Sequence, residues 1–80
     1  MSKDQLIKDF PKAHSFEQMA QMLKAAHLME PKFLNSLYRT YHIRYNRQNH
    51  RFQSDFDHPN IFYDATYQDV RECVVQLLLK

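Results

Sequence analysis

The sequence predicts an α+β protein that is mainly helical, with three N-terminal helices, a β-hairpin and a C-terminal helix. Apolar residues recur at spacings of three and four before residue 42 and after residue 64, whereas they alternate with polar residues between 43 and 56. The chain has 80 residues, of which 44% are hydrophobic and 14% aromatic. This supports one domain over residues 1–80 with a single core.

The first two predicted helices share a starting pattern, a serine followed three residues later by a glutamine. Ser2 with Gln5 begins a short helix that Pro11 ends, because proline cannot donate the hydrogen bond that a helix interior requires. The same pattern recurs at Ser15, where a second helix over residues 15–27 is expected.

The third helix is predicted to begin at Pro31. Proline lacks a backbone N–H, and this costs nothing in the first turn of a helix, where the N–H groups have no partner within the helix. Its apolar stripe includes Tyr38 and Tyr41, which favours a core role for these two rings. Beyond it, apolar residues alternate on both sides of the turn-forming residues Asn46–Asn49, which is typical of a β-hairpin.

After the hairpin, residues 57–60 are expected to form a loop and residues 61–63 a short strand or an extended link. Asp64 or Thr66 then caps the last helix. This order of elements resembles a winged helix-turn-helix in outline, with the third helix in the recognition position and the turn at Arg47 as the wing. The resemblance is one of element order.

Charge is distributed unevenly, although the formal net charge is only +2. No acidic residue lies between Glu30 and Asp55, and the basic residues in that stretch are Lys32, Arg39, Arg44, Arg47 and Arg51. Residues 55–80 carry five carboxylates against two basic side chains, a net charge of −3. The molecule is therefore expected to be electrically polarised.

The segment from Tyr38 to Arg51 combines four arginines with three tyrosines and no carboxylate. Guanidinium groups suit phosphate oxygens and guanine edges, and tyrosine rings can stack on unpaired bases. We therefore predict a small non-enzymatic, regulator-like domain that binds nucleic acid, with DNA favoured over RNA. Its predicted contact residues are Lys32, Asn35, Arg39, Arg44, Arg47, Gln48 and Arg51.

A protein partner is the alternative that the same residues allow. Arginine and tyrosine are favoured anchors at protein interfaces, so the basic segment would also suit an acidic protein surface. The chain would then be an adaptor or inhibitor, including the small phage-encoded kind that acts on a host nuclease or defence complex. Contact between the acidic C-terminal part and the basic segment of a second copy would give a homodimer.

Enzymatic and cofactor sites are not expected. Glycine is absent, which excludes P-loops, dinucleotide fingerprints and nucleophile elbows, and the turns are expected to use Asn, Asp and Pro instead. The five histidines lack diagnostic metal-binding spacing, although His42, His50 and His58 would be a conceivable group.

The remaining features bear on the cellular compartment in which the protein is expected. The lone Cys73 lies on the apolar face of the last helix, where an inert thiol and a reducing, cytoplasmic setting are the expectation. No run of about 18 apolar residues occurs, so we expect no membrane association.

Overall fold

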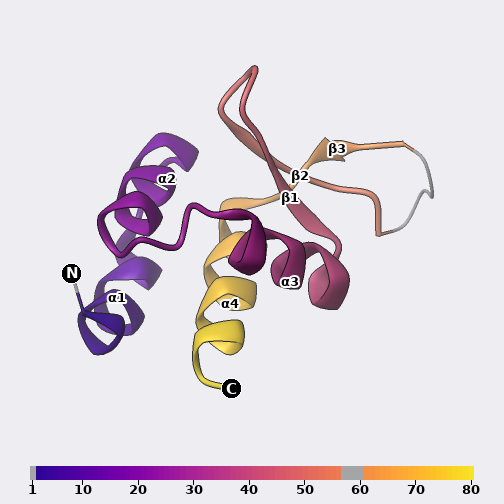
Figure 1. The fold of residues 1–80 in the computed structure, drawn as a ribbon. Coiled ribbons are helices and arrows are strands. Elements are labelled where there is room, and N and C mark those ends of the chain that lie inside the picture. Colours follow the sequence, from indigo (N-terminus) through magenta and orange to yellow (C-terminus); the bar gives the residue numbers. More distant parts are fainter. Residues whose placement is uncertain (1, 57–60) are drawn as a thin grey trace.

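The computed structural model describes residues 2–56 and 61–80, and in this part of the chain helices surround one face of a small antiparallel sheet (Figure 1). The elements are α1 (Lys3–Asp9), the 3₁₀ helix η1 (Phe10–Lys12), α2 (Phe16–Ala25), α3 (Pro31–Tyr41), β1 (Ile43–Asn46), β2 (Arg51–Ser54), β3 (Tyr63–Asp64) and α4 (Tyr67–Leu78). The mainly helical α+β class is confirmed. The loop predicted over 57–60 lies outside the described residues.

Helices α1, α2 and α4 each begin at a side chain that accepts a backbone hydrogen bond. The accepting residues are Ser2, Ser15 and Thr66, and in each case the donor is the N–H three residues later, at 3.0–3.1 Å. Both predicted serine caps are confirmed. Thr66 rather than Asp64 caps α4, because Asp64 is already part of β3. Helix α3 begins at Pro31, as predicted.

Three histidines adopt the left-handed backbone conformation that glycine usually fills. The φ angles are 59° at His27, 59° at His42 and 57° at His50. Histidine enters this region more readily than most residues with a Cβ, which explains its use in a chain without glycine. The expectation that turns rely on Asn, Asp and Pro was therefore incomplete. Asn46 and Asn49 do serve as predicted, each accepting from the N–H two residues later.

Strand β2 lies in the middle of the sheet and pairs antiparallel with both β1 and β3. The predicted hairpin is therefore confirmed, and the short strand near residues 61–63 begins at Tyr63. The register places Arg44 beside Gln53 and Gln53 beside Asp64. Since side chains alternate between the two faces of a strand, these three share the outer face, opposite the buried Phe52.

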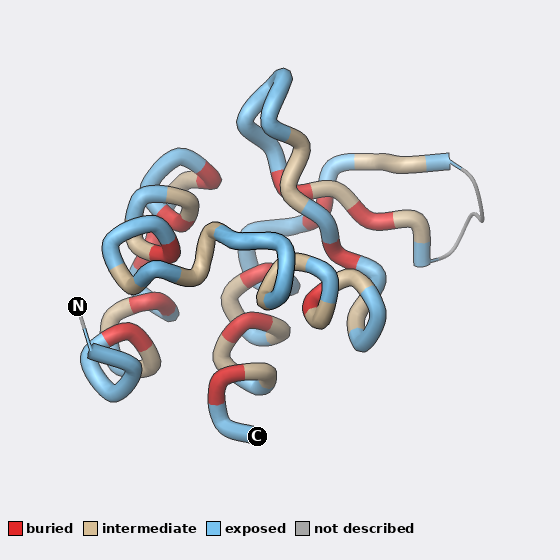
Figure 2. Tube along the Cα trace, viewed as in Figure 1, coloured by how far each residue is buried: buried red, intermediate tan, exposed pale blue. Residues whose placement is uncertain are grey.

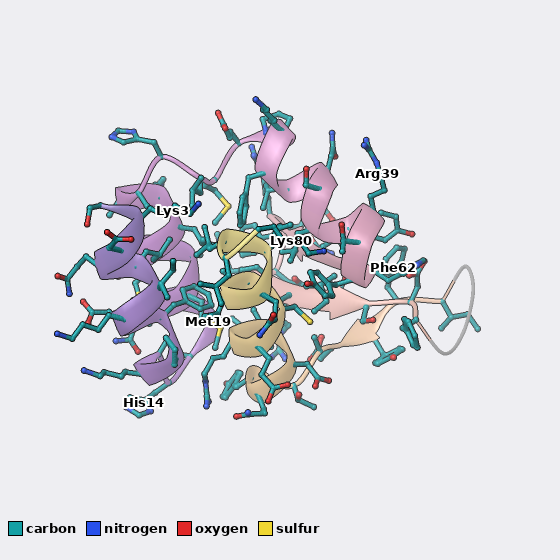
Figure 3. All side chains as sticks on the ribbon, turned by 90° about the horizontal axis from the view of Figure 1, so that it is seen from below. Lys3, His14, Met19, Arg39, Phe62 and Lys80 are labelled. Carbon is teal, nitrogen blue, oxygen red and sulfur yellow. The ribbon has the colours of Figure 1, made fainter. Side chains whose placement is uncertain are left out.

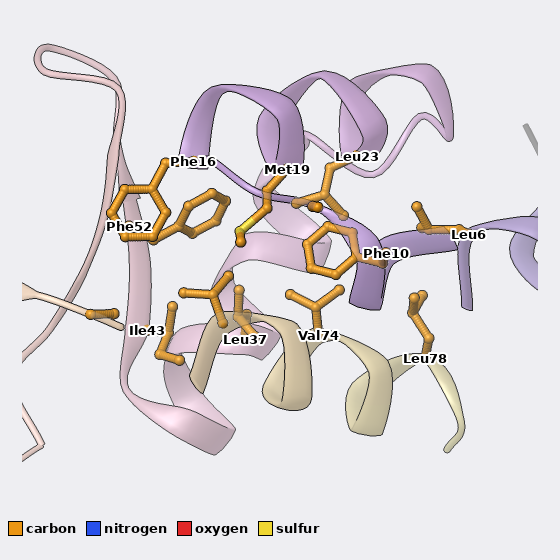
Figure 4. Close-up of a cluster of buried hydrophobic side chains, with 13 residues drawn as sticks. Leu6, Phe10, Phe16, Met19, Leu23, Leu37, Ile43, Phe52, Val74 and Leu78 are labelled. Carbon is orange, nitrogen blue, oxygen red and sulfur yellow. The ribbon is translucent and has the colours of Figure 1, made fainter. Parts of the chain in front are cut away.

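The core lies between the helices and the inner face of the sheet (Figure 2). Phe52 anchors the sheet, because its ring centroid lies 5.6 Å from that of Phe16 on α2. Figure 4 shows this cluster, which comprises Leu6, Phe10, Ala13, Phe16, Met19, Leu23, Leu37, Ile43, Phe52, Ala65, Val70, Val74 and Leu78. Across residues 2–56 and 61–80, every helix falls short of the length and apolar character that a membrane crossing needs.

Helix α3 packs against β1 and α4, whereas α2 packs against β2. The β1–β2 hairpin consequently extends beyond the helices, and its tip is exposed (Figures 1 and 2). The winged-helix outline stays a prediction, since the order of elements fits it but α2 packs mainly on the sheet.

Candidate nucleic-acid interface

The outward face of α3 carries three of the predicted contact residues. Lys32, Asn35 and Arg39 are all exposed and lie at spacings of three and four, on the side opposite the buried Leu37. Within the described ranges, no ion pair occupies Lys32 or Arg39. Their charges are therefore available to a partner.

Beside this face, Asp55 binds two side chains from the end of α3. Tyr38 Oη donates to Asp55 Oδ2 at 2.7 Å, and His42 Nδ1 lies 3.2 Å from Asp55 Oδ1. The hydrogen bond from Tyr38, and to a lesser degree that from His42, lowers the pKa of Asp55, while burial opposes this shift. An ionised carboxylate only accepts hydrogen bonds, so His42 must carry a proton on Nδ1. The Asp55 side chain is largely inaccessible to solvent, with 11% of its surface exposed.

Arg44 lies over the ring of Phe62, with its guanidinium carbon 3.8 Å from the ring centroid. The Phe62 ring is in turn 6.2 Å from that of Tyr38, which brings Arg44 close to the last turn of α3. Arg39 and Phe62 lie at the same end of the molecule (Figure 3). We call Lys32, Asn35, Arg39 and Arg44 together the α3–Arg44 surface.

Arg51 occupies the outer face of the sheet, diagonal to Arg44, but its guanidinium binds the carboxylate of Asp64. From the sequence, Arg51 was expected to be free to bind a partner, because Asp64 is 13 residues further along the chain. Strand β3 brings this carboxylate next to β2, and the charge of Arg51 is balanced within the chain.

Arg47 and Gln48 lie in the turn at the hairpin tip, apart from the α3–Arg44 surface. Arg47 lines a pocket between the hairpin and α2, to which Lys24 also contributes. The backbone N–H of Gln48 donates to Asn46 Oδ1 at 2.9 Å, and its side chain is exposed. The seven predicted residues thus divide among three places: the α3–Arg44 surface, the outer sheet face at Arg51 and the hairpin tip.

Aromatic side chains near the α3–Arg44 surface were missed from the sequence. Phe56 is 69% exposed, and its ring stands edge-on to that of His42, with centroids 5.7 Å apart. Phe62 supports Arg44. The alternation that predicted the hairpin extends to Phe56, but strand β2 ends at Ser54. Tyr38, predicted as a core residue, is half-buried with its hydroxyl bound to Asp55.

The histidines and the cysteine are placed as separate groups. His42 binds Asp55, and His50 Nδ1 lies 3.1 Å from Tyr45 Oη; His58 is outside the described residues. In the described chain, no three His, Cys, Asp or Glu side chains are arranged to hold a metal ion. Burial, together with Asp69 and Glu72, raises the pKa of Cys73 and so disfavours its reactive thiolate.

The α3–Arg44 surface presents three exposed cationic side chains and one exposed amide. Among the residues that the structure describes, no carboxylate forms an ion pair with these three cations, and both oxygens of the Asp55 carboxylate already have hydrogen-bond partners. Asn35 adds both a donor and an acceptor at the centre of the helix face. Comparison of the chain with protein families, with curated proteins and with solved structures gives no match.

Proposed function

We propose that the chain is a small non-enzymatic nucleic-acid-binding domain and that the α3–Arg44 surface makes the contact. One observation carries this proposal. Lys32, Arg39 and Arg44 are exposed without a carboxylate partner among the described residues; the first two share one face of α3, and Arg44 is on the adjoining strand β1. Such a group of exposed positive charges suits the phosphate backbone of a nucleic acid.

The residues of this surface would make different kinds of contact with the nucleic acid. The three cations would hold phosphates, which fixes position without reading sequence. Asn35 lies between them and would read a base edge, since its amide matches the donor and acceptor of adenine. Arg51 would contribute less, because a phosphate must compete with Asp64 for its guanidinium. Arg47 and Gln48 would reach only a target that extends to the hairpin tip.

Salt dependence provides the test. Each neutralised phosphate releases counterions, so three contacts to duplex DNA predict a slope of about −2.7 in a plot of log affinity against log salt. The change Arg39→Gln with Arg44→Gln should reduce the steepness of that slope by about 1.8. The matched control is Lys8→Gln with Lys12→Gln, an equal change of net charge at exposed positions on α1 and η1. Labelled duplex and single strand should both be titrated by fluorescence anisotropy.

Two results would contradict the proposal. One is that neither the labelled duplex nor the labelled single strand binds at low salt. The other is an equal loss of affinity in the double variant and in the control, because that outcome would reflect net charge and not the α3–Arg44 surface.

A second candidate function is docking on an acidic protein surface. Phe56 and Ile61 are 69% and 62% exposed, and exposed large apolar side chains beside arginines are typical of protein interfaces. Pull-down with and without nuclease treatment separates the two functions when it is repeated with Phe56→Ser. A protein that survives nuclease and is lost with Phe56→Ser supports docking. Capture that nuclease abolishes supports nucleic acid.

A further inference from the structure

A pocket of about 420 Å³ lies between helix α2 and the hairpin. One stripe of α2 forms its first wall, because the lining residues of this helix follow at spacings of three and four. The hairpin forms the second wall, and the connection between α2 and α3 contributes one methionine. The lining residues are Glu17, Ala20, Gln21, Lys24, Met29, Tyr45, Arg47 and His50. We call this the α2–hairpin pocket.

The pocket has an excess of positive charge. Lys24 belongs to the helix wall and Arg47 to the hairpin wall, and Glu17 is the only acidic residue among the described residues of the lining. No salt bridge in the described ranges involves any of these three side chains. An anion placed between the two walls could therefore contact both cations, and His50 would add a third positive charge when protonated.

The same pocket offers a flat apolar surface. The Tyr45 ring is fixed on one side by Phe52, with centroids 5.0 Å apart, and its hydroxyl lies 3.1 Å from His50 Nδ1. Met29 and Ala20 complete the apolar part of the lining. A volume of about 420 Å³ is within the range of small-molecule sites in proteins. A ligand that joins an anionic group to a planar ring would use both parts of this lining.

We propose that the α2–hairpin pocket binds a phosphorylated nucleoside, with Lys24 and Arg47 on the phosphate and the base against Tyr45. The ligand is either a free mononucleotide or the phosphorylated end of a strand, since both present the same chemistry. This site is separate from the α3–Arg44 surface and does not depend on the function proposed there. It gives Arg47 a role that its position at the hairpin tip otherwise lacks.

The pocket can be tested by titrating the full chain with AMP, with adenosine and with inorganic phosphate. Binding is measured from the changes in amide chemical shifts in NMR spectra. We expect AMP to bind more tightly than either of its parts and to shift the amides of the lining residues first. A short 5′-phosphorylated strand forms a fourth arm. Affinity equal to that of AMP identifies a free nucleotide as the ligand, and tighter binding identifies a strand end.

Variants of the lining sharpen this test. Lys24→Gln and Arg47→Gln should each weaken AMP binding about tenfold, as expected for loss of one hydrogen bond to a charged group. Glu17→Gln should strengthen it, because the change removes a carboxylate from the lining. Lys12→Gln is the matched control and should leave the affinity unchanged, since Lys12 is exposed on η1, outside the lining.

The proposal is overturned by any of three results. The first is no shift of the lining amides at up to about 10 mM AMP. The second is equal binding of AMP and adenosine, which would leave the cations without a role. The third is equal weakening by Lys24→Gln and Lys12→Gln. The α3–Arg44 surface is unaffected by these outcomes, because Arg39→Gln with Arg44→Gln leaves the pocket lining intact.

Discussion

Tyr38 Oη donates a 2.7 Å hydrogen bond to Asp55 Oδ2, and this bond ties helix α3 to the segment that follows β2. It lowers the pKa of Asp55 and raises the pKa of Tyr38. The two groups are 17 residues apart in the sequence. The Tyr38 ring also lies 6.2 Å from that of Phe62, on which Arg44 stacks.

Acid should destabilise the protein through Asp55. A carboxylate whose pKa is lowered by folding stabilises the fold fully above its unfolded-state pKa of about 4. That contribution is lost as the pH falls through the lower folded-state pKa. We therefore expect Asp55→Asn to flatten the decline in unfolding free energy between about pH 5 and pH 2, measured by urea denaturation. An unchanged decline in Asp55→Asn would contradict this assignment.

Alkaline conditions should act on the same bond through Tyr38. Its pKa is raised by folding, so its contribution is complete below the unfolded-state pKa of about 10 and is lost as the pH rises through the higher folded-state value. Tyr38→Phe keeps the ring and removes the hydroxyl. It should weaken the dependence of stability on pH at both ends of the range, measured by urea denaturation, and an unchanged pH dependence would contradict this role of the hydroxyl.

Glycine at position 27 should stabilise the protein. His27 has φ of 59° and is exposed, and a residue with a Cβ pays about 1 kcal/mol in this conformation. Allowing for the greater freedom of glycine in the unfolded chain, His27→Gly should raise the unfolding free energy by about 0.5 kcal/mol. His14→Gly is the matched control: His14 is exposed and has a negative φ, so glycine there should destabilise. Thermal denaturation of both variants gives the comparison.

The serine that begins α2 should contribute measurably to stability. Ser15 Oγ accepts from the Gln18 N–H at 3.0 Å, and loss of such a cap costs about 1 kcal/mol. Ser15→Ala should therefore lower the urea midpoint. Ser36→Ala should not, because Ser36 lies inside α3 and its hydroxyl binds the Lys32 carbonyl of its own helix. Equal effects of the two changes would argue against the cap.

The contact between Arg44 and Phe62 should be detectable as a coupling energy. Exposed cation–π contacts contribute about 0.5–1 kcal/mol, and the 3.8 Å separation is within their range. A double-mutant cycle with Arg44→Gln and Phe62→Leu should give a coupling of that size. The same cycle with Arg39→Gln in place of Arg44→Gln is the control and should show none, since no cation–π contact joins Arg39 to a ring in the described chain.

Local signals in the sequence determined the helices and the hairpin. Capping at Ser2 and Ser15, the start of α3 at Pro31 and the change of apolar period after Tyr41 all act over a few residues, so they can be read without knowledge of the fold. The outward face of α3, with Lys32, Asn35 and Arg39, follows from the same helical period. These predictions needed no long-range contact.

Long-range packing determines which of these cations remain available to a partner and where they lie. Asp64 reaches Arg51 because β3 joins the sheet, Phe62 reaches Arg44 from the same segment, and Arg47 faces α2 across a pocket. Each of these contacts joins residues that are far apart in the chain. The order of residue types along a sequence does not directly show which of them lie close together in space. The sequence alone therefore showed that the middle of the chain is basic, while packing divided that charge among three places.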